Sequence, residues 1–180
     1  MNTVHCKYCL SLGLEWSSQK EHDSETDHMG EVLPGLFIGM NIHSTSYPEL
    51  KASNIGHVIS MAFECKPSKY HLCKTFYVPL HDSDGEYALD AFKQAAKIID
   101  SIFNDNSSTG NGSGSNSNGN GNVLVHCQLG KSRSVGAVIA YLILYKGFSF
   151  DDGYAAVRRV RPFARLNPAY IQQLRSLALE

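Results

Sequence analysis

The feature of this 180-residue sequence that most constrains its fold is residues 126–134, which read HCQLGKSRS. The apolar run at residues 123–125 precedes this segment, and an apolar pattern with helical spacing begins at Val135. The pattern therefore predicts a strand, a tight loop that contains glycine, and a helix. In such a unit, loop N–H groups and the positive end of the helix dipole point at one place. We expect this place to bind phosphate.

Two side chains of the loop suit phosphate-ester chemistry. Cys127 opens the loop, where inward-facing amides and nearby cations lower a thiol pKa to roughly 3.5–7.5. Arg133 offers a planar fork that binds two phosphate oxygens at once. The other expected phosphate-binding positions are Gln128, Leu129, Gly130, Lys131 and Ser132. A nucleophile, an anion cradle and a clamp in one loop predict a phosphate-ester hydrolase that forms a phospho-cysteine.

The order of His126, Cys127, Arg133 and Ser134 resembles the signature of the cysteine-dependent protein tyrosine phosphatases. Its HCxxGxxRS form resembles the atypical dual-specificity branch. Further similar segments are residues 32–39, 55–60, 157–162, 167–168 and 173–174. The resemblance implies an α/β fold with a central, mostly parallel sheet flanked by helices. It places the signature loop between the central strand and a buried helix, and it implies no metal and no cofactor.

The resemblance also implies a general acid. Asp82 follows an expected strand at residues 75–80, where the family carries the carboxylate that protonates the leaving oxygen and later activates water. Asp84 is the alternative, because it lies on the same expected loop.

Three more side chains are expected to support the loop. In the family, the histidine at position 126 orders the loop by hydrogen bonds. Ser134 can donate a hydrogen bond to the cysteine sulfur, or it can cap the following helix. Asn167 reads as a helix cap, and the resemblance implies that it also braces the loop.

Two regions stand outside the regular pattern. Residues 1–30 are polar and rich in histidine, and we interpret them as a partly flexible appendage to a catalytic domain at 31–180. Residues 104–122 are almost entirely Asn, Gly and Ser, a composition that no burial can order. They follow an amphipathic helix expected to end near Phe103, and we interpret them as an insertion in a surface loop.

Composition excludes several classes of protein. The net charge of −1 gives no basic field for nucleic acid or an anionic membrane. The longest apolar run, residues 135–145, is too short to span a bilayer. Five cysteines form an odd set, and the first residues lack a basic start and an apolar core. These features favour reduced thiols in the cytoplasm, with the nucleus as second compartment. We also expect a monomer.

A nucleotide and a zinc ion fit the sequence less well as ligands. Gly130-Lys131-Ser132 resembles the end of a nucleotide-binding P-loop, but that motif needs a glycine at position 125, which is valine. A zinc site would draw on His5, Cys6, Cys9, His22 and His28. The histidines are spaced more widely than is usual for zinc, so we expect no structural metal.

Substrate choice rests on the shape and charge of the site. The dual-specificity resemblance implies a shallow pocket that admits phosphoserine and phosphothreonine beside phosphotyrosine, so phosphorylated proteins are the first choice. Lys131 stands where most protein-directed members carry a small or apolar residue. This lysine favours a phosphoinositide or another phospholipid headgroup as the alternative substrate. A silent phospho-binding protein is the third interpretation, and RNA 5′-triphosphate fits least because a basic surface is missing.

Overall fold

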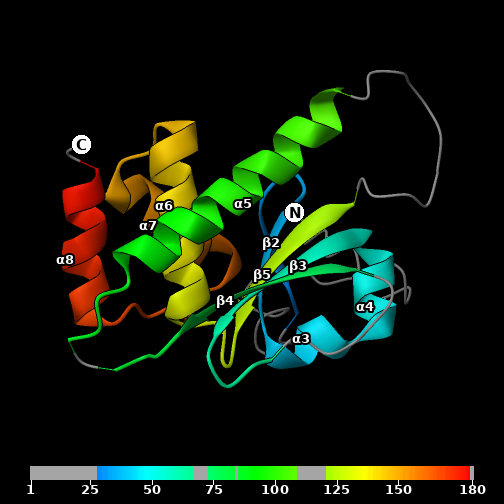
Figure 1. Cartoon of the computed structure of the whole chain (residues 1–180), viewed down its shortest axis with the longest axis horizontal. Coiled ribbons are helices and arrows are strands. Elements are labelled where there is room, and N and C mark those ends of the chain that lie inside the picture. Colours follow the sequence, from blue (N-terminus) through cyan, green and yellow to red (C-terminus); the bar gives the residue numbers. More distant parts are fainter. Residues whose placement is uncertain (1–27, 67–72, 84, 109–120, 179–180) are drawn as a thin grey trace, which may run out of the picture.

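A computed structural model describes residues 28–66, 73–83, 85–108 and 121–178. Its core is a five-stranded sheet with the order β1-β2-β5-β3-β4 (Figure 1). The strands are β1 Gly30–Leu33, β2 Leu36–Met40, β3 Ile55–Ala62, β4 Lys74–Leu80 and β5 Asn122–Cys127. β1 pairs with β2 in an antiparallel manner, and the other three pairings are parallel. The mostly parallel α/β fold predicted from the sequence is confirmed.

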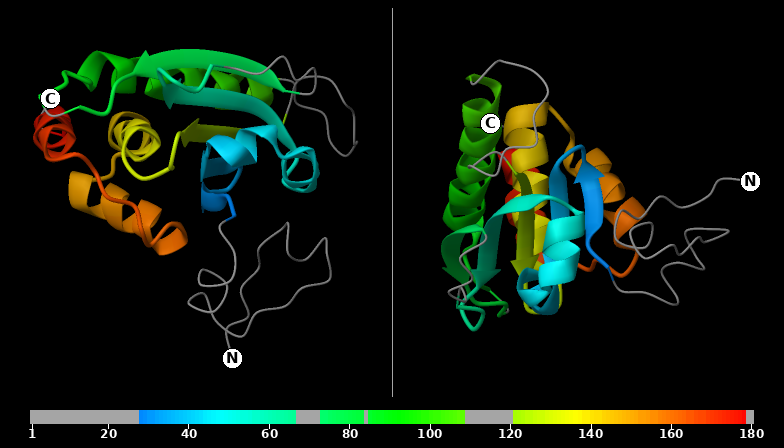
Figure 2. Two further views of the ribbon diagram at one scale, coloured as in Figure 1. Left: turned by 90° about the horizontal axis from the view of Figure 1, so that it is seen from below. Right: turned by 90° about the vertical axis from the view of Figure 1, so that its right-hand side faces the viewer.

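Helices cover the sheet on both faces (Figures 1 and 2). They are α3 Asn41–Thr45, α4 Tyr47–Ala52, α5 Leu89–Ser108, α6 Arg133–Lys146, α7 Phe150–Val160 and α8 Pro168–Leu177. The main core joins the sheet to α5, α6, α7 and α8, with Ile59, Phe92 and Ile139 fully buried in it. A smaller core on the α3 and α4 face includes Leu50 and Leu124.

Strand β5 supplies both cores, because successive side chains of a strand point to opposite faces. Val125 and Cys127 belong to the main core, and Leu124 belongs to the smaller one. His126 falls on the α3 and α4 face by the same alternation. The strand therefore delivers its cysteine and its histidine to opposite sides of the sheet.

The insertion is shorter than the range 104–122 expected from the sequence, because regular structure extends into both ends of that range. Helix α5 continues to Ser108, and the Asn104 side chain donates to Asp100 one turn earlier at 2.8 Å. Asn122 already belongs to β5, where its N–H donates to the Asn54 carbonyl at 2.8 Å. Asparagine amides bond locally to side chains and backbone, which the composition alone does not reveal. Residues 109–120 lie outside the described residues, as does the N-terminal segment 1–27.

Local capping rules succeed at the C-terminal helices. Gly147 ends α6 in the left-handed region with φ 69°, and Ser149 caps α7 by accepting from Asp152 N at 3.1 Å. Asn167 accepts from Ala169 N at 2.9 Å ahead of Pro168. Ser46 differs, because it separates two short helices and forms no side-chain cap.

Candidate active site

The signature loop lies at the carboxyl end of the central strand, between Cys127 and the start of α6. Gly130 has φ 61°, in the left-handed region. A Cβ at this position would lie 2.6 Å from the Gly39 carbonyl oxygen and 2.7 Å from Arg161 Nε. Both the backbone angle and the close neighbours therefore require glycine. The requirement comes from packing behind the loop.

Four consecutive loop carbonyls accept hydrogen bonds from surrounding elements. The donors are Asn41 N to Gln128 O (3.2 Å), Arg161 Nη2 to Leu129 O (3.2 Å), Arg161 Nε to Gly130 O (2.6 Å) and Arg165 N to Lys131 O (2.8 Å). Arg161 is only 1% exposed, and its bond to the Gly130 carbonyl is buried. With the carbonyls held from outside, the loop has the form of an anion-binding nest. Arg161 was not predicted from the sequence, although the arginine before Pro162 marks the end of a helix.

Cys127 and Ser134 meet at the floor of this loop. Cys127 is 2% exposed, and its Sγ lies 3.3 Å from Ser134 Oγ. Helix α6 begins at Arg133, and Ser132 takes the cap position without a side-chain cap bond. The interpretation of Ser134 as a helix cap is therefore wrong. Its hydroxyl contacts the sulfur.

Glu64 holds the Arg133 guanidinium. Both Nη atoms donate to the Glu64 carboxylate at 2.7 Å, and Nη1 also donates to the Leu80 carbonyl at 3.1 Å. The hydrogen bond from Arg133 lowers the pKa of Glu64, so this carboxylate is charged at neutral pH. Glu64 was not predicted, and its one signal is its place directly after a buried strand.

These bonds leave one edge of the Arg133 guanidinium open. A guanidinium carries five N–H groups, and Glu64 and Leu80 take three of them. The remaining two belong to Nε and Nη2, the edge that can bind two oxygens of one anion. Arg133 Nε is buried and has no hydrogen-bond partner among the described residues. The arginine therefore keeps a fixed fork free for an anion.

Asp82 lies beside this open edge. Its Oδ2 is 3.6 Å from Arg133 Nε, and its Oδ1 accepts from Ser132 Oγ at 3.0 Å. The side chain is 31% exposed. The structure thus brings Asp82, Arg133 and the loop together, while Asp84 lies outside the described residues.

Helix α8 fastens the segment that carries Asp82. Tyr170 Oη donates to the His81 carbonyl at 2.6 Å, and Asn167 Nδ2 donates to the Ser83 carbonyl at 3.0 Å. Asn167 N also donates to Ser132 Oγ at 3.2 Å. Asn167 therefore links the cap of α8 to both the Asp82 segment and the signature loop. The Ser132 hydroxyl thus donates to Asp82 and accepts from Asn167 N.

His126 is buried on the opposite face of the sheet, with 3% of its surface exposed. Burial lowers its pKa to about 4, although a hydrogen bond with the Cys127 backbone acts in the opposite direction. The ring is therefore neutral at pH 7. Its Nδ1 has no hydrogen-bond partner within the described part of the chain.

This burial predicts a loss of stability in acid. An unfolded histidine titrates near 6.5 and the folded His126 near 4, so the unfolded state binds the proton first. The contribution is complete above pH 6.5 and is lost as the pH falls toward 4, by about 3 kcal/mol. Urea unfolding of wild type and His126→Gln at pH 7 and pH 4 measures this difference. His81→Gln, at an exposed position, is the control. An equal loss in wild type and His126→Gln would contradict the assignment.

The rim of the loop is exposed and mixed in character. Leu129 is 55% exposed, and Lys131 is exposed beside it. Phe63 is 50% exposed, and its ring packs 4.4 Å from the ring of His81. The rim therefore combines one cation with apolar surface.

The described ranges contain no cluster of three or more His, Cys, Asp or Glu side chains that could hold a metal ion. His5, Cys6, Cys9 and His22 lie outside these ranges. No helix within them is long and apolar enough to cross a membrane.

Comparisons with known proteins agree with this fold and loop. The model of the dual specificity phosphatase catalytic domain matches residues 36–178. The chain therefore belongs to the dual specificity phosphatase family.

Relatives differ in how much of their length is matched. Dual specificity protein phosphatase 1B of Arabidopsis thaliana is 31% identical over 160 residues, which cover 89% of this chain and 87% of that protein. Protein phosphatase Slingshot homolog 3 of Mus musculus is 26% identical over 157 residues, covering 85% of this chain but 21% of that protein. The crystal structure of DUSP15 has 27% sequence identity and a TM-score of 0.73, covering 85% of this chain and 88% of that chain.

Proposed function

We propose that this protein is a dual-specificity phosphatase that hydrolyses phosphotyrosine, phosphoserine and phosphothreonine monoesters of proteins through a phospho-cysteine. The observation that carries the proposal is the open edge of Arg133. A guanidinium whose other donors are fixed by Glu64 and Leu80 is preorganised for one anion, and it stands in the same loop as Cys127. Preorganised donors of this kind supply the largest share of transition-state stabilisation in many enzymes.

In the first step, the Cys127 thiolate attacks phosphorus while the bond from phosphorus to the leaving oxygen breaks. Arg133 Nε and Nη2, with the loop N–H groups, hold the non-bridging oxygens. Asp82, protonated for this step, gives its proton to the leaving oxygen. An alcohol or phenol departs, and the phosphoryl group remains on sulfur.

In the second step, the Asp82 carboxylate accepts a proton from water, and the water oxygen attacks phosphorus. The sulfur leaves as a thiolate, which the Ser134 hydroxyl stabilises from 3.3 Å. Inorganic phosphate is released, and Asp82 is again protonated. The contact of Asp82 with Arg133 Nε gives way when phosphate takes the open edge.

The chemistry requires reduced cysteine. The described cysteines Cys65, Cys73 and Cys127 are all free. We therefore place the protein in a reducing compartment, the cytoplasm or the nucleus, and expect it to act as a monomer on phosphorylated proteins.

The charge of Lys131 bears on the choice between protein and lipid substrates. A single exposed cation contributes about 1 kcal/mol or less to a second phosphate, too little to make a lipid headgroup site by itself. Phosphopeptides should therefore be the better substrates, and Lys131→Ala should lower their kcat/KM by less than about fivefold.

Parallel kinetics on phosphotyrosine and phosphothreonine peptides and on soluble phosphoinositides test this choice. Lys97→Ala, an exposed lysine on α5, controls for the loss of charge. Poor turnover of every peptide, with a large loss confined to phosphoinositides in Lys131→Ala, would establish the lipid alternative. Tight binding of phosphopeptides without release of phosphate from any substrate would establish a silent binding protein.

A further inference from the structure

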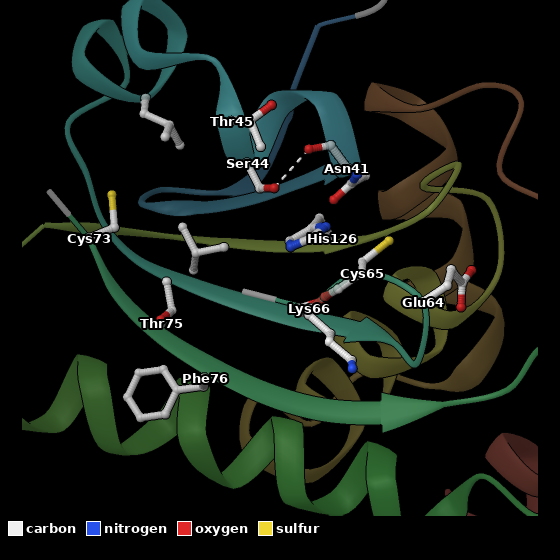
Figure 3. A pocket seen from close by; sticks show the side chains of 13 residues that line it. Asn41, Ser44, Thr45, Glu64, Cys65, Lys66, Cys73, Thr75, Phe76 and His126 are labelled. Carbon is white, nitrogen blue, oxygen red and sulfur yellow. Dashed lines mark hydrogen bonds between the residues drawn. The ribbon is translucent and has the colours of Figure 1, made fainter. Parts of the chain in front are cut away.

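A cavity of about 260 Å³ lies on the α3 and α4 face of the sheet. Its lining comes from α3, α4, β3, β4, the segment after β3 and one residue of β5 (Figure 3). We call it the back pocket and define it by Ser44, Leu50, Val58, Ser60, Thr75 and His126. At about 30 Å³ for each water, its volume corresponds to roughly nine waters. This space suits a small organic molecule.

The back pocket offers a buried polar ring. His126 lines it and is only 3% exposed. A ligand hydroxyl that reaches this ring can form a hydrogen bond with it. The ring is neutral at pH 7, so it can either donate or accept.

The charge at one end of the pocket is positive. Glu64, Cys65 and Lys66 lie at this end, beside His126, whereas Cys73 and Thr75 lie at the other (Figure 3). The negative charge of Glu64 is compensated by the positive charge of Arg133, which donates two hydrogen bonds to it. Lys66 forms no ion pair with any described residue, so one positive charge stays uncompensated within the described lining.

The apolar part of the pocket is formed by Leu50 and Val58, which belong to the smaller core. An occupant that satisfies all three features carries one negative charge, an apolar body and a hydroxyl. The class that fits is a small hydroxylated organic acid.

The pocket also touches residues that hold the signature loop from behind. Cys65 Sγ donates to Gln128 Oε1 at 2.9 Å, and Asn41 N donates to the Gln128 carbonyl at 3.2 Å. Glu64 lines the pocket and holds Arg133. A molecule in the pocket therefore contacts the residues that position both ends of the loop.

We propose that the back pocket binds a small hydroxylated organic monoanion, with its carboxylate beside Lys66, its body against Leu50 and Val58, and its hydroxyl at His126. Bound there, it lowers turnover without competing with substrate. Its negative charge beside Glu64 repels the negative charge of the phosphoryl group in the transition state. The binding site stands independently of the proposed phosphatase activity, and only this effect on turnover rests on it.

Titration of the full-length protein with 3-hydroxybenzoate tests the site, followed by amide NMR at saturating inorganic phosphate. We expect shifts at Ser60, Thr75 and His126 that phosphate does not abolish. Thr75→Phe, from an exposed position on the edge strand, should fill the cavity and weaken binding at least about tenfold. Lys66→Gln should weaken it about two- to fivefold, whereas Lys51→Gln, outside the pocket, should leave it unchanged. Neutral 3-hydroxybenzyl alcohol should bind wild type and Lys66→Gln alike.

The site is wrong if 3-hydroxybenzoate does not bind, if phosphate displaces it, or if Lys66→Gln binds it like wild type. The last criterion decides the matter should Thr75→Phe not fold. The coupling is tested by the turnover of an aryl phosphate at saturating substrate, which should fall at least twofold with 3-hydroxybenzoate bound. Binding without this fall in turnover would refute the proposed effect on catalysis but not the proposed binding site. An inactive protein that binds as described would refute the proposed function alone.

Discussion

Replacing Cys127 by serine is expected to reduce hydrolysis of an aryl phosphate by more than about 10⁴-fold. Serine keeps the shape of the loop, but its hydroxyl is a much weaker nucleophile than the sulfur of cysteine. The carbonyl braces from Asn41, Arg161 and Arg165 are unaffected, so inorganic phosphate should bind within about threefold of wild type. Steady-state kinetics and phosphate titration by calorimetry measure the two quantities.

Cys73→Ser is the matched control, because it removes a free thiol that lies away from the loop. It should retain full activity. Turnover by Cys127→Ser at more than a few per cent of the wild-type rate would refute a covalent step at this residue.

Replacing Asp82 by asparagine is expected to slow turnover by about 10²–10⁴-fold for substrates with poor leaving groups. Asparagine can still accept from Ser132 Oγ, so the local geometry is kept while the transferable proton is lost. Formation of the phospho-enzyme from good leaving groups needs little protonation, so kcat/KM for these substrates should fall much less. The limb of the pH–rate profile that reports the protonated acid should flatten.

Asp84→Asn is the control for this prediction. It should keep both the leaving-group dependence and the shape of the pH profile. If Asp84→Asn shows the altered pattern and Asp82→Asn does not, the acid lies two residues further along the chain than proposed.

The strand, loop and helix around Cys127 could be predicted because their signals are local. The apolar run before the loop, the glycine within it and the helical spacing after it lie within a short stretch of chain. The caps at Ser149 and Asn167 were predictable for the same reason, since a cap side chain bonds to the first turn of its own helix.

The braces of the site could not be predicted in this way. Glu64 meets Arg133 across 69 positions, and Arg161 meets Gly130 across 31. Nothing in the composition near Glu64 or Arg161 shows which carbonyl or cation each will face. The pair of Glu64 and Arg133 follows from the strand order, which puts the carboxyl ends of β3 and β5 side by side.

The end of helix α5 was also missed, because an Asn- and Ser-rich segment reads as loop by composition. A helix that is already nucleated can continue through poor helix formers at modest cost. The contact between Asn104 and Asp100 adds to this continuation. Composition therefore located the insertion but not its ends.

Trapping the phospho-enzyme tests the covalent mechanism most directly. Asp82→Asn lacks the base that activates water, so the phosphoryl group should accumulate on sulfur when this variant reacts with an aryl phosphate that has a good leaving group. Rapid acid quench followed by peptide mass spectrometry should find the phosphoryl group on Cys127, and Cys127→Ser should show none. Stoichiometric release of the leaving group without phosphate on Cys127, or with phosphate on another residue, would contradict the mechanism.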